Sequence, residues 1–373
     1  MTYSPIDISK NGVRVLRSSN IQEDKFIYSE DDVFVNKNAI NIDYVKNNDI
    51  LITSANGSTR LVGKHALISG LPSSSAVHGG FMLLATANEN PEFLNASMSS
   101  SWYSKFIELF VSGGNGAIGN LSKSDLDEQE ILVPSSEEQK KLGQLFKMID
   151  NLITLHQSKY DKLVNVKKAL LEKMFPKDGK NVPEIRFKGF TDTWEQRKFK
   201  NYFDERNERT GIGEMISVTI SSGIKKFSEL NRYDSKPDDL SKYKRVVEGD
   251  IAYNSMRMWQ GASGYSPYTG ILSPAYTVIK PKDGISAKFF SYQIKRPEMI
   301  HQFELNSQGL TKDTLNLKFP AFSEIETTAP IKVNEQNKIA KLLEKVDNLI
   351  TLHQHKLEKL KNMKKSLLNK MFI

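Results

Sequence analysis

The sequence predicts an α+β protein in which two mixed α/β domains are separated by two long helices that form an antiparallel coiled coil with pseudo-twofold symmetry. Three observations carry this prediction. A 38-residue segment occurs twice at an offset of 197 residues, and both copies place apolar residues at helical spacing. The sequence before each copy contains short runs typical of strands and of short helices.

The repeat is the clearest feature of the chain. Residues 138–175 align without a gap to residues 335–372, with 23 identities in 38 positions, and both copies contain the run DNLITLHQ. A duplicated half explains this identity, whereas chance does not. At 1.5 Å per residue, each copy would form a helical rod of ~57 Å.

Each copy carries an apolar stripe with the 4-3-4-3 spacing of a coiled coil. One such helix cannot bury its stripe alone, and duplication favours antiparallel pairing of the two copies. The stripe positions are Leu142, Phe146, Ile149, Ile153, Tyr160, Leu163, Leu170 and Met174, and in the second copy Ile339, Leu343, Val346, Ile350, Leu357, Leu360, Leu367 and Met371.

Two polar positions interrupt the stripe in both copies, His156 with His353 and Lys167 with Lys364. A polar residue in such a seam costs stability but fixes the register of the helices. Because each histidine lies at the middle of its helix, antiparallel pairing predicts that His156 and His353 lie near each other. No carboxylate or cysteine accompanies them at ligand spacing, which disfavours a metal site.

The remaining sequence predicts two mixed domains with short elements. We expect strands at 13–17, 49–53, 81–86, 216–220, 251–254 and 276–280, and short helices at 101–110 and 287–295. Pro134 and Pro330 end the domains before the long helices. The expected segments are a first domain at 1–134, a helix at 135–175, a linker at 176–182, a second domain at 183–331 and a helix at 332–373.

The charge of the chain is concentrated in the repeat. The net charge is +8, and the two repeated segments together hold seventeen lysines against eight acids. A basic surface favours a polyanionic partner such as DNA, although a solvated lysine-rich helix face is an equally ordinary explanation.

Composition also narrows the class of protein. The absence of cysteine excludes disulfides and thiolate chemistry and favours a cytoplasmic location. The first residues lack a basic start followed by an apolar run, so we expect no signal peptide. No run of 18 apolar residues occurs, and we expect no membrane span.

Two short motifs resemble nucleotide-binding sequences but lack features that such sites require. Residues 114–119 match GxGxxG, but no βαβ pattern surrounds them. Residues 57–64 resemble a phosphate-binding loop whose glycines are one residue too far apart, and His65 stands where a serine or threonine would bind magnesium. No methyltransferase tetrapeptide or nuclease cluster occurs, so we expect no catalysis by this chain.

The junction between the halves carries a family resemblance. The segment PEIRFKGFTDTWEQRKF at 183–199, after a helix that ends in KMFPK, closely resembles the junction opening a recognition domain in specificity (S) subunits of type I restriction-modification systems. The pairs Glu138-Gln139 and Glu335-Gln336 resemble the start of that family's conserved helices. The order domain–helix–domain–helix also fits, and the resemblance covers nearly the whole chain.

The resemblance implies a DNA-recognition subunit without catalytic activity. In that family, each target-recognition domain reads one half of a split target in double-stranded DNA, and the helices set the spacing. The subunit binds two modification (methyltransferase) subunits and, in the full complex, two restriction subunits. S-adenosylmethionine, magnesium and ATP are expected on those partners, with no cofactor on this chain, in the cytoplasm of a bacterium or archaeon. One departure is that the first half lacks a counterpart of residues 183–196, so we expect the first domain to be incomplete at its N-terminal side.

Residues that contact DNA are expected in the polar loops after the central strands, because Arg, Lys, Asn and Gln read base edges and hydroxyl or cationic side chains bind phosphates. Arg257 is the strongest candidate for reading a base. The full set is Ser54, Asn56, Thr59, Arg60, Lys64, Lys225, Lys226, Lys244, Arg245, Asn254, Ser255, Arg257, Gln260 and Lys312. Leucines on the outer side of the helices are expected to contact the modification subunits: Leu145, Leu152, Leu155, Leu342, Leu349 and Leu352.

Two other classes of function compete with DNA recognition. An interaction scaffold would use the coiled coil as a platform for proteins or glycans. DNA binding should weaken steeply with added salt, whereas an apolar protein contact need not. An enzyme with a site on a loop is disfavoured, because no nucleophile–base pair or paired carboxylates occur at catalytic spacing.

Overall fold

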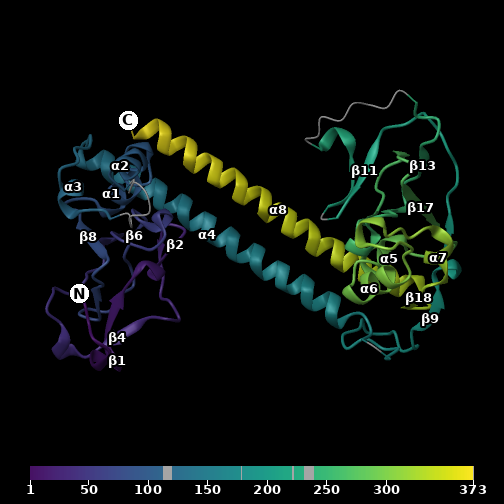
Figure 1. The fold of residues 1–373 in the computed structure, drawn as a ribbon, viewed down its shortest axis with the longest axis horizontal. Coiled ribbons are helices and arrows are strands. Elements are labelled where there is room, and N and C mark those ends of the chain that lie inside the picture. The colour runs from purple at the N-terminus through teal and green to yellow at the C-terminus, as the bar shows by residue number, and fades with distance from the viewer. Residues whose placement is uncertain (112–119, 178, 221, 231–238, 373) are drawn as a thin grey trace. The chain divides into compact units, whose positions relative to one another are not determined.

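The computed structural model describes residues 1–111, 120–177, 179–220, 222–230 and 239–372. The chain divides into two compact units, unit 1 (Met1–Ser158 with His353–Ile373) and unit 2 (Lys159–Leu352). Each unit contains one mixed domain and part of each of the two long helices drawn in Figure 1. The boundaries between the two units lie inside both long helices. The five segments expected from the sequence instead treat each long helix as separate from the domains.

Unit 1 contains two three-stranded sheets, with strand orders β4-β1-β7 and β6-β5-β8, and a two-stranded ribbon of β2 and β3. The strands are β1 (Ile8–Leu16), β2 (Ile21–Gln22), β3 (Lys25–Phe26), β4 (Val33–Val35), β5 (Asp49–Thr53), β6 (His65–Leu67), β7 (Ala76–His78) and β8 (Met82–Thr86). Every residue of β5 is buried. Because side chains alternate along a strand, Leu51 joins one core cluster while Ile50 and Ile52 join another on the opposite face.

Three short helices follow the sheets of unit 1. They are α1 (Pro91–Ser97), α2 (Ser101–Val111) and α3 (Lys123–Asp127). The side chain of Asn90 caps α1 by accepting a hydrogen bond from the backbone N–H of Phe93. Tyr103 and Phe106 of α2 pack in the cluster that contains Ile50 and Ile52, so α2 covers one face of β5.

Unit 2 is built around a four-stranded sheet of order β10-β17-β14-β15, with three two-stranded pairs β11-β12, β13-β16 and β18-β9. Its strands are β9 (Glu195–Lys198), β10 (Phe203–Glu205), β11 (Ile216–Thr219), β12 (Gly223–Lys226), β13 (Lys244–Val246), β14 (Ile251–Asn254), β15 (Ser263–Tyr265), β16 (Gly270–Leu272), β17 (Tyr276–Pro281) and β18 (Glu326–Ala329). Its short helices are α5 (Ala287–Gln293), α6 (Pro297–Leu305) and α7 (Phe319–Glu324).

The two units share one plan. The antiparallel order β6-β5-β8 recurs as β15-β14-β17, and two short helices follow it in both units. Asn48 and Gly249 open β5 and β14 from the same turn, with φ of 75° and 100°. The carboxylates of Asp49 and Asp250 each accept a hydrogen bond of 2.8 Å from the backbone N–H three residues earlier. Residues 48–50 and 249–251 therefore occupy equivalent places in the two units.

The long helices are α4 (Ser136–Lys173) and α8 (Val333–Met371). In unit 1, Asp150 pairs with Lys364 at 2.7 Å, and in unit 2, Lys167 pairs with Asp347 at 2.6 Å. Asp150 corresponds to Asp347 in the repeat, and Lys167 to Lys364, so both units contain the same ion pair with the helices exchanged. The predicted antiparallel pairing is confirmed within each unit.

The predicted elements agree closely with the structure. All six strands and both short helices expected in the domains are present, although β1 begins five residues before the strand expected at 13–17. The apolar stripe is buried or half-buried with one exception, since Met371 is 40% exposed while its neighbour Leu368 is buried. Met371 is the last residue of α8. None of the described helices is both long and apolar enough to cross a membrane.

Candidate nucleic-acid interface

The loops that follow the central strands occupy equivalent places in the two units. The backbone carbonyl of Ser54, just after β5, accepts a hydrogen bond of 2.7 Å from the N–H of Leu121. The carbonyl of Ser255, just after β14, accepts one of 2.8 Å from the N–H of Leu317. A 3₁₀ turn follows each serine, at Thr59–Leu61 and Met258–Gln260. Each loop is therefore fixed to the fold by the same bond, while its sequence differs.

Ser54 and Ser255 help to attach these loops to the fold and are not part of the exposed surface. Both side chains are buried, and the hydroxyl of Ser255 lies 2.7 Å from the hydroxyl of Thr277. The sequence placed both serines among the DNA-contact candidates because they follow a strand and precede polar residues. The structure directs their hydroxyls inward, so the exposed part of each loop starts one or more residues later.

In unit 1, the loop presents Thr59 and Arg60 to solvent, and Lys64 is half-buried. The side-chain amide of Asn56 donates to the hydroxyl of Ser18 at 3.1 Å and lines a cleft of about 630 Å³. Arg17 also lines this cleft, which makes it a cationic candidate that the sequence analysis missed. Its place directly after β1 was the available signal.

In unit 2, the corresponding loop forms a local cluster of polar and aromatic side chains. Arg257 is exposed and donates to the side-chain oxygen of Gln260 at 3.4 Å. The ammonium of Lys312 lies 5.6 Å from the ring centre of Trp259, so Lys312 belongs to the same surface. Asn254 is half-buried and its side-chain oxygen accepts from the N–H of Met256. Trp259 is a contact candidate that the sequence analysis missed.

The other four cations of the candidate set belong to strands β12 and β13 and each has an acidic neighbour. The pairs are Lys225 with Glu229 at 3.8 Å, Lys226 with Glu214 at 2.9 Å, Lys244 with Glu205 at 3.6 Å and Arg245 with Glu208 at 3.1 Å. The hydrogen bond that the ammonium of Lys226 donates to the carboxylate of Glu214 raises the pKa of Lys226. These partners compensate part of the positive charge that phosphates would otherwise meet.

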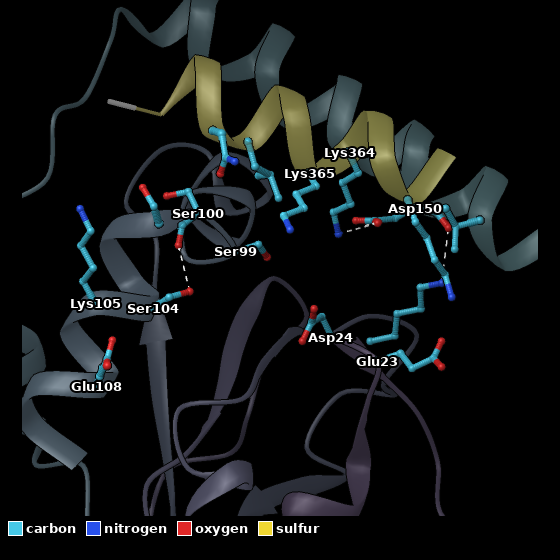
Figure 2. A pocket seen from close by; sticks show the side chains of 16 residues that line it. Glu23, Asp24, Ser99, Ser100, Ser104, Lys105, Glu108, Asp150, Lys364 and Lys365 are labelled. Atoms are coloured by element: carbon cyan, nitrogen blue, oxygen red, sulfur yellow. Dashed lines mark hydrogen bonds and ion pairs between the residues drawn. The ribbon is translucent and has the colours of Figure 1, made fainter. Parts of the chain in front are cut away.

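A second cleft of unit 1, of about 720 Å³, lies beside α8 and the start of α2 (Figure 2). Figure 2 shows Lys364 directed at Asp150 and Lys365 directed into the cleft from the same helix. Five lysines and four acids line it, so its charge is nearly balanced. By charge alone, this cleft is therefore a weak candidate for binding phosphate.

The seam residues meet as the repeat predicts. The Nδ1 atoms of His156 and His353 lie 2.8 Å apart, and their ring centres lie 5.0 Å apart. Both residues belong to unit 1, where α4 and α8 run in opposite directions. Lys167 and Lys364 form the two equivalent ion pairs described above. All four side chains thus bridge the helices.

The outer leucines are exposed where both helices face solvent. The exposed fractions are 38% for Leu152 and 48% for Leu155 on α4, and 36% for Leu349 and 46% for Leu352 on α8. Leu145 and Leu342 are half-buried, and Leu342 packs against the core of unit 2. Four of the six outer leucines are therefore exposed in this chain.

The described residues show no nucleotide-binding geometry at the two motifs that resemble nucleotide sites. The GxGxxG match at 114–119 lies outside them. In the stretch 57–64 the backbone forms a short 3₁₀ turn at Thr59–Leu61, and no α-helix begins there as a phosphate-binding loop requires. No group of three or more His, Cys, Asp or Glu side chains suited to a metal occurs among the described residues.

Comparison with known proteins identifies the fold and the family. A family described as "Type I restriction modification DNA specificity domain" matches residues 7–165 and 191–362. The type I restriction enzyme MjaVIII specificity subunit of Methanocaldococcus jannaschii is 25% identical over 354 residues, which cover 87% of this chain and 78% of that protein. A second protein of that organism, described as an MjaX specificity subunit, is 23% identical over 339 residues, covering 86% of this chain and 76% of that protein.

A solved structure supports the fold. The S subunit of a type I restriction-modification system from M. genitalium matches with a TM-score of 0.62 at 14% identity, covering 100% of this chain and 92% of that one. The family match spans both halves of the chain, and the scaffold alternative is not favoured. The chain belongs to the family of type I restriction-modification DNA specificity domains, and it is a non-catalytic subunit that confers DNA sequence specificity.

Proposed function

We propose that each mixed domain reads one half of a bipartite DNA target and that α4 and α8 set the distance between the halves. The observation that carries this proposal is the pair of equivalent loops, 54–61 and 255–260, on one shared plan. Their attachment is the same, but their polar side chains differ, with exposed Thr59 and Arg60 in one loop and exposed Arg257 beside half-buried Gln260 in the other. Similar scaffolds with different polar tips are suited to different half-sites.

We further propose that two modification subunits dock on the exposed leucines of the helices. Burying a leucine side chain contributes about 1.5–3 kcal/mol, so each pair of exposed leucines supplies a substantial part of an interface. S-adenosylmethionine would then be bound by those partners, and magnesium and ATP by the restriction subunits. The partners and their number are inferred from the family, and a cytoplasmic location follows from the same inference.

Methylome sequencing of a host that carries the complete system tests the split target. The expected result is a methylated motif with two short specified parts separated by unspecified bases. Substitutions in the loop 255–260 should then change one part only, and substitutions in the loop 54–61 the other part only. A continuous motif, or one loop altering both parts, contradicts the proposal.

A further inference from the structure

The segment 306–316 of unit 2, named the second loop, lies beside the loop 255–260. The N–H of Leu317, directly after the second loop, donates a hydrogen bond of 2.8 Å to the carbonyl of Ser255. Helix α6, directly before the second loop, packs against the 3₁₀ turn of the loop 255–260. Both ends of the second loop are therefore fixed to the loop that carries the proposed base contacts.

The surface that the two loops share is polar, with charges of both signs. The ammonium of Lys312 lies 5.6 Å from the ring centre of Trp259 and 3.3 Å from the carboxylate of Glu304. Arg257 is exposed on the first of the two loops, and Asp313 is exposed on the second loop. Two cations therefore stand against two acids, so recognition at this surface depends on individual contacts more than on net charge.

The second loop is closed by its own hydrogen bonds. The backbones of Gln308 and Asn316 exchange two hydrogen bonds, of 3.0 and 2.8 Å. The hydroxyl of Thr314 accepts a hydrogen bond of 3.1 Å from the backbone N–H of Thr311. A Cβ at Gly309 would lie 2.6 Å from the carbonyl oxygen of Thr314, so this close approach requires glycine. The loop therefore holds the residue after Gly309 in a defined place.

That residue is Leu310, whose side chain is fully exposed. An aliphatic side chain has no hydrogen-bonding group, so it can neither bind a phosphate nor pair with the donors and acceptors of a base edge. In the major groove, where Arg257 is proposed to read a base, the apolar group available to such a side chain is the C5 methyl group of thymine. The place and the chemistry of Leu310 therefore match one particular feature of DNA.

We infer that Leu310 contacts the C5 methyl group of a thymine in the half of the DNA target that unit 2 reads. The contact removes two apolar surfaces from water, which favours thymine over a base without the methyl group. Arg257 then reads a base edge, and the second loop adds an A·T pair to the same half. The inference rests on the proposed function and deepens it, because it names a base that this half must contain.

Uracil isolates the methyl group, because it differs from thymine only by lacking it. The complex with the modification subunits is tested by competition with target duplexes in which single thymines of this half are replaced by uracil. One position should weaken binding by about fourfold, the effect of leaving one methyl group unburied. Leu310→Ser should bind the thymine and uracil duplexes alike at that position. A half without thymine on either strand, or an unchanged uracil effect in Leu310→Ser, overturns the inference.

Leu305→Ser is the matched control for the loss of an exposed leucine. Leu305 is 65% exposed at the end of α6 and lies outside the second loop. This variant should keep the full effect of uracil. Loss of the uracil effect in Leu305→Ser as well would mean that the effect does not depend on a contact at Leu310, and the inference would be wrong.

Arg257→Ala separates this inference from the proposed function. The variant should bind the target more weakly but still prefer thymine to uracil, because the two contacts involve different base pairs. If Arg257→Ala lowers specific binding and Leu310→Ser leaves the uracil effect intact, only the thymine contact is wrong. If neither variant changes specific binding, the reading of this half by the loop 255–260 is wrong, and the inference is wrong with it.

Discussion

The Nδ1 atoms of His156 and His353 lie 2.8 Å apart, so one imidazole donates and the other accepts. An imidazole nitrogen can accept only while it carries no proton, which requires at least one neutral ring. These two residues are identical positions of the duplicated helix, brought together because α4 and α8 run in opposite directions. The contact therefore reports the antiparallel register directly.

A double-mutant cycle on this pair should reveal coupling. We expect His156→Leu or His353→Leu alone to destabilise the chain by about 1 kcal/mol, because each removes the hydrogen bond between the two imidazoles. The double variant should cost less than the sum of the singles. Urea unfolding at pH 7.5 measures the three variants against the parent chain. Additive effects of the two substitutions would mean that the contact contributes nothing.

The outer leucines predict a specific assembly defect. Replacing both Leu152 and Leu349 by Asp should abolish co-purification with the modification subunits, because a carboxylate in an apolar interface is strongly unfavourable. Binding should weaken at least about tenfold per site. Circular dichroism should remain unchanged, since both side chains are partly exposed in the isolated chain.

Asn151→Asp with Asn348→Asp is the matched control for this prediction. Both asparagines are exposed, each precedes one of the leucines, and the substitutions add the same charge to the same turns. The control should assemble normally. If the leucine variant also assembled normally, the docking surface would have to lie elsewhere.

Replacing Arg257 should weaken binding at one base pair of the DNA target. Arg257→Ala should cost about 1–3 kcal/mol at one base pair of the target and relax specificity there. Competition binding with target duplexes substituted at single positions measures this effect. Lys226→Ala offers the contrast, because a lysine on a strand should lower the affinity for all sequences alike. A uniform loss for Arg257→Ala would reassign it to a phosphate contact.

The burial of His65 should make the folding stability of unit 1 decrease at acidic pH. Its ring is buried against Tyr103 with ring centres 5.3 Å apart, and burial lowers its pKa from the ordinary value of 6.5. Below pH 6.5, the unfolded chain takes up a proton that the folded site resists, so the unfolded state binds more protons and stability falls as the pH drops. The slope from one such group approaches about 1.4 kcal/mol per pH unit.

Urea unfolding of unit 1 at pH 7.5 and 5.5 tests this dependence. His65→Gln should show a smaller decrease between the two pH values than the parent chain. Some decrease should remain, because burial also lowers the pKa of His78. An equal decrease in parent and variant would show that His65 has no part in the acid sensitivity.

The sequence by itself determined the organisation of the chain. The repeat predicted α4 and α8, their antiparallel pairing and the meeting of His156 with His353, because duplicated amphipathic helices have few ways to bury their stripes. The strands β5 and β14 were predictable for a related reason, since a short apolar run bounded by turn residues is a strong local signal.

The tertiary structure alone decided which polar side chains are available. Ser54 and Ser255 follow a strand as any surface serine might, yet both are buried, and their carbonyls accept hydrogen bonds from the distant residues Leu121 and Leu317. Likewise, Met371 repeats Met174 in sequence, yet one is exposed and the other buried. Local patterns report propensity and periodicity, whereas exposure depends on which distant segment packs on a residue. That dependence is why the helices could be derived from sequence and the binding surfaces could not.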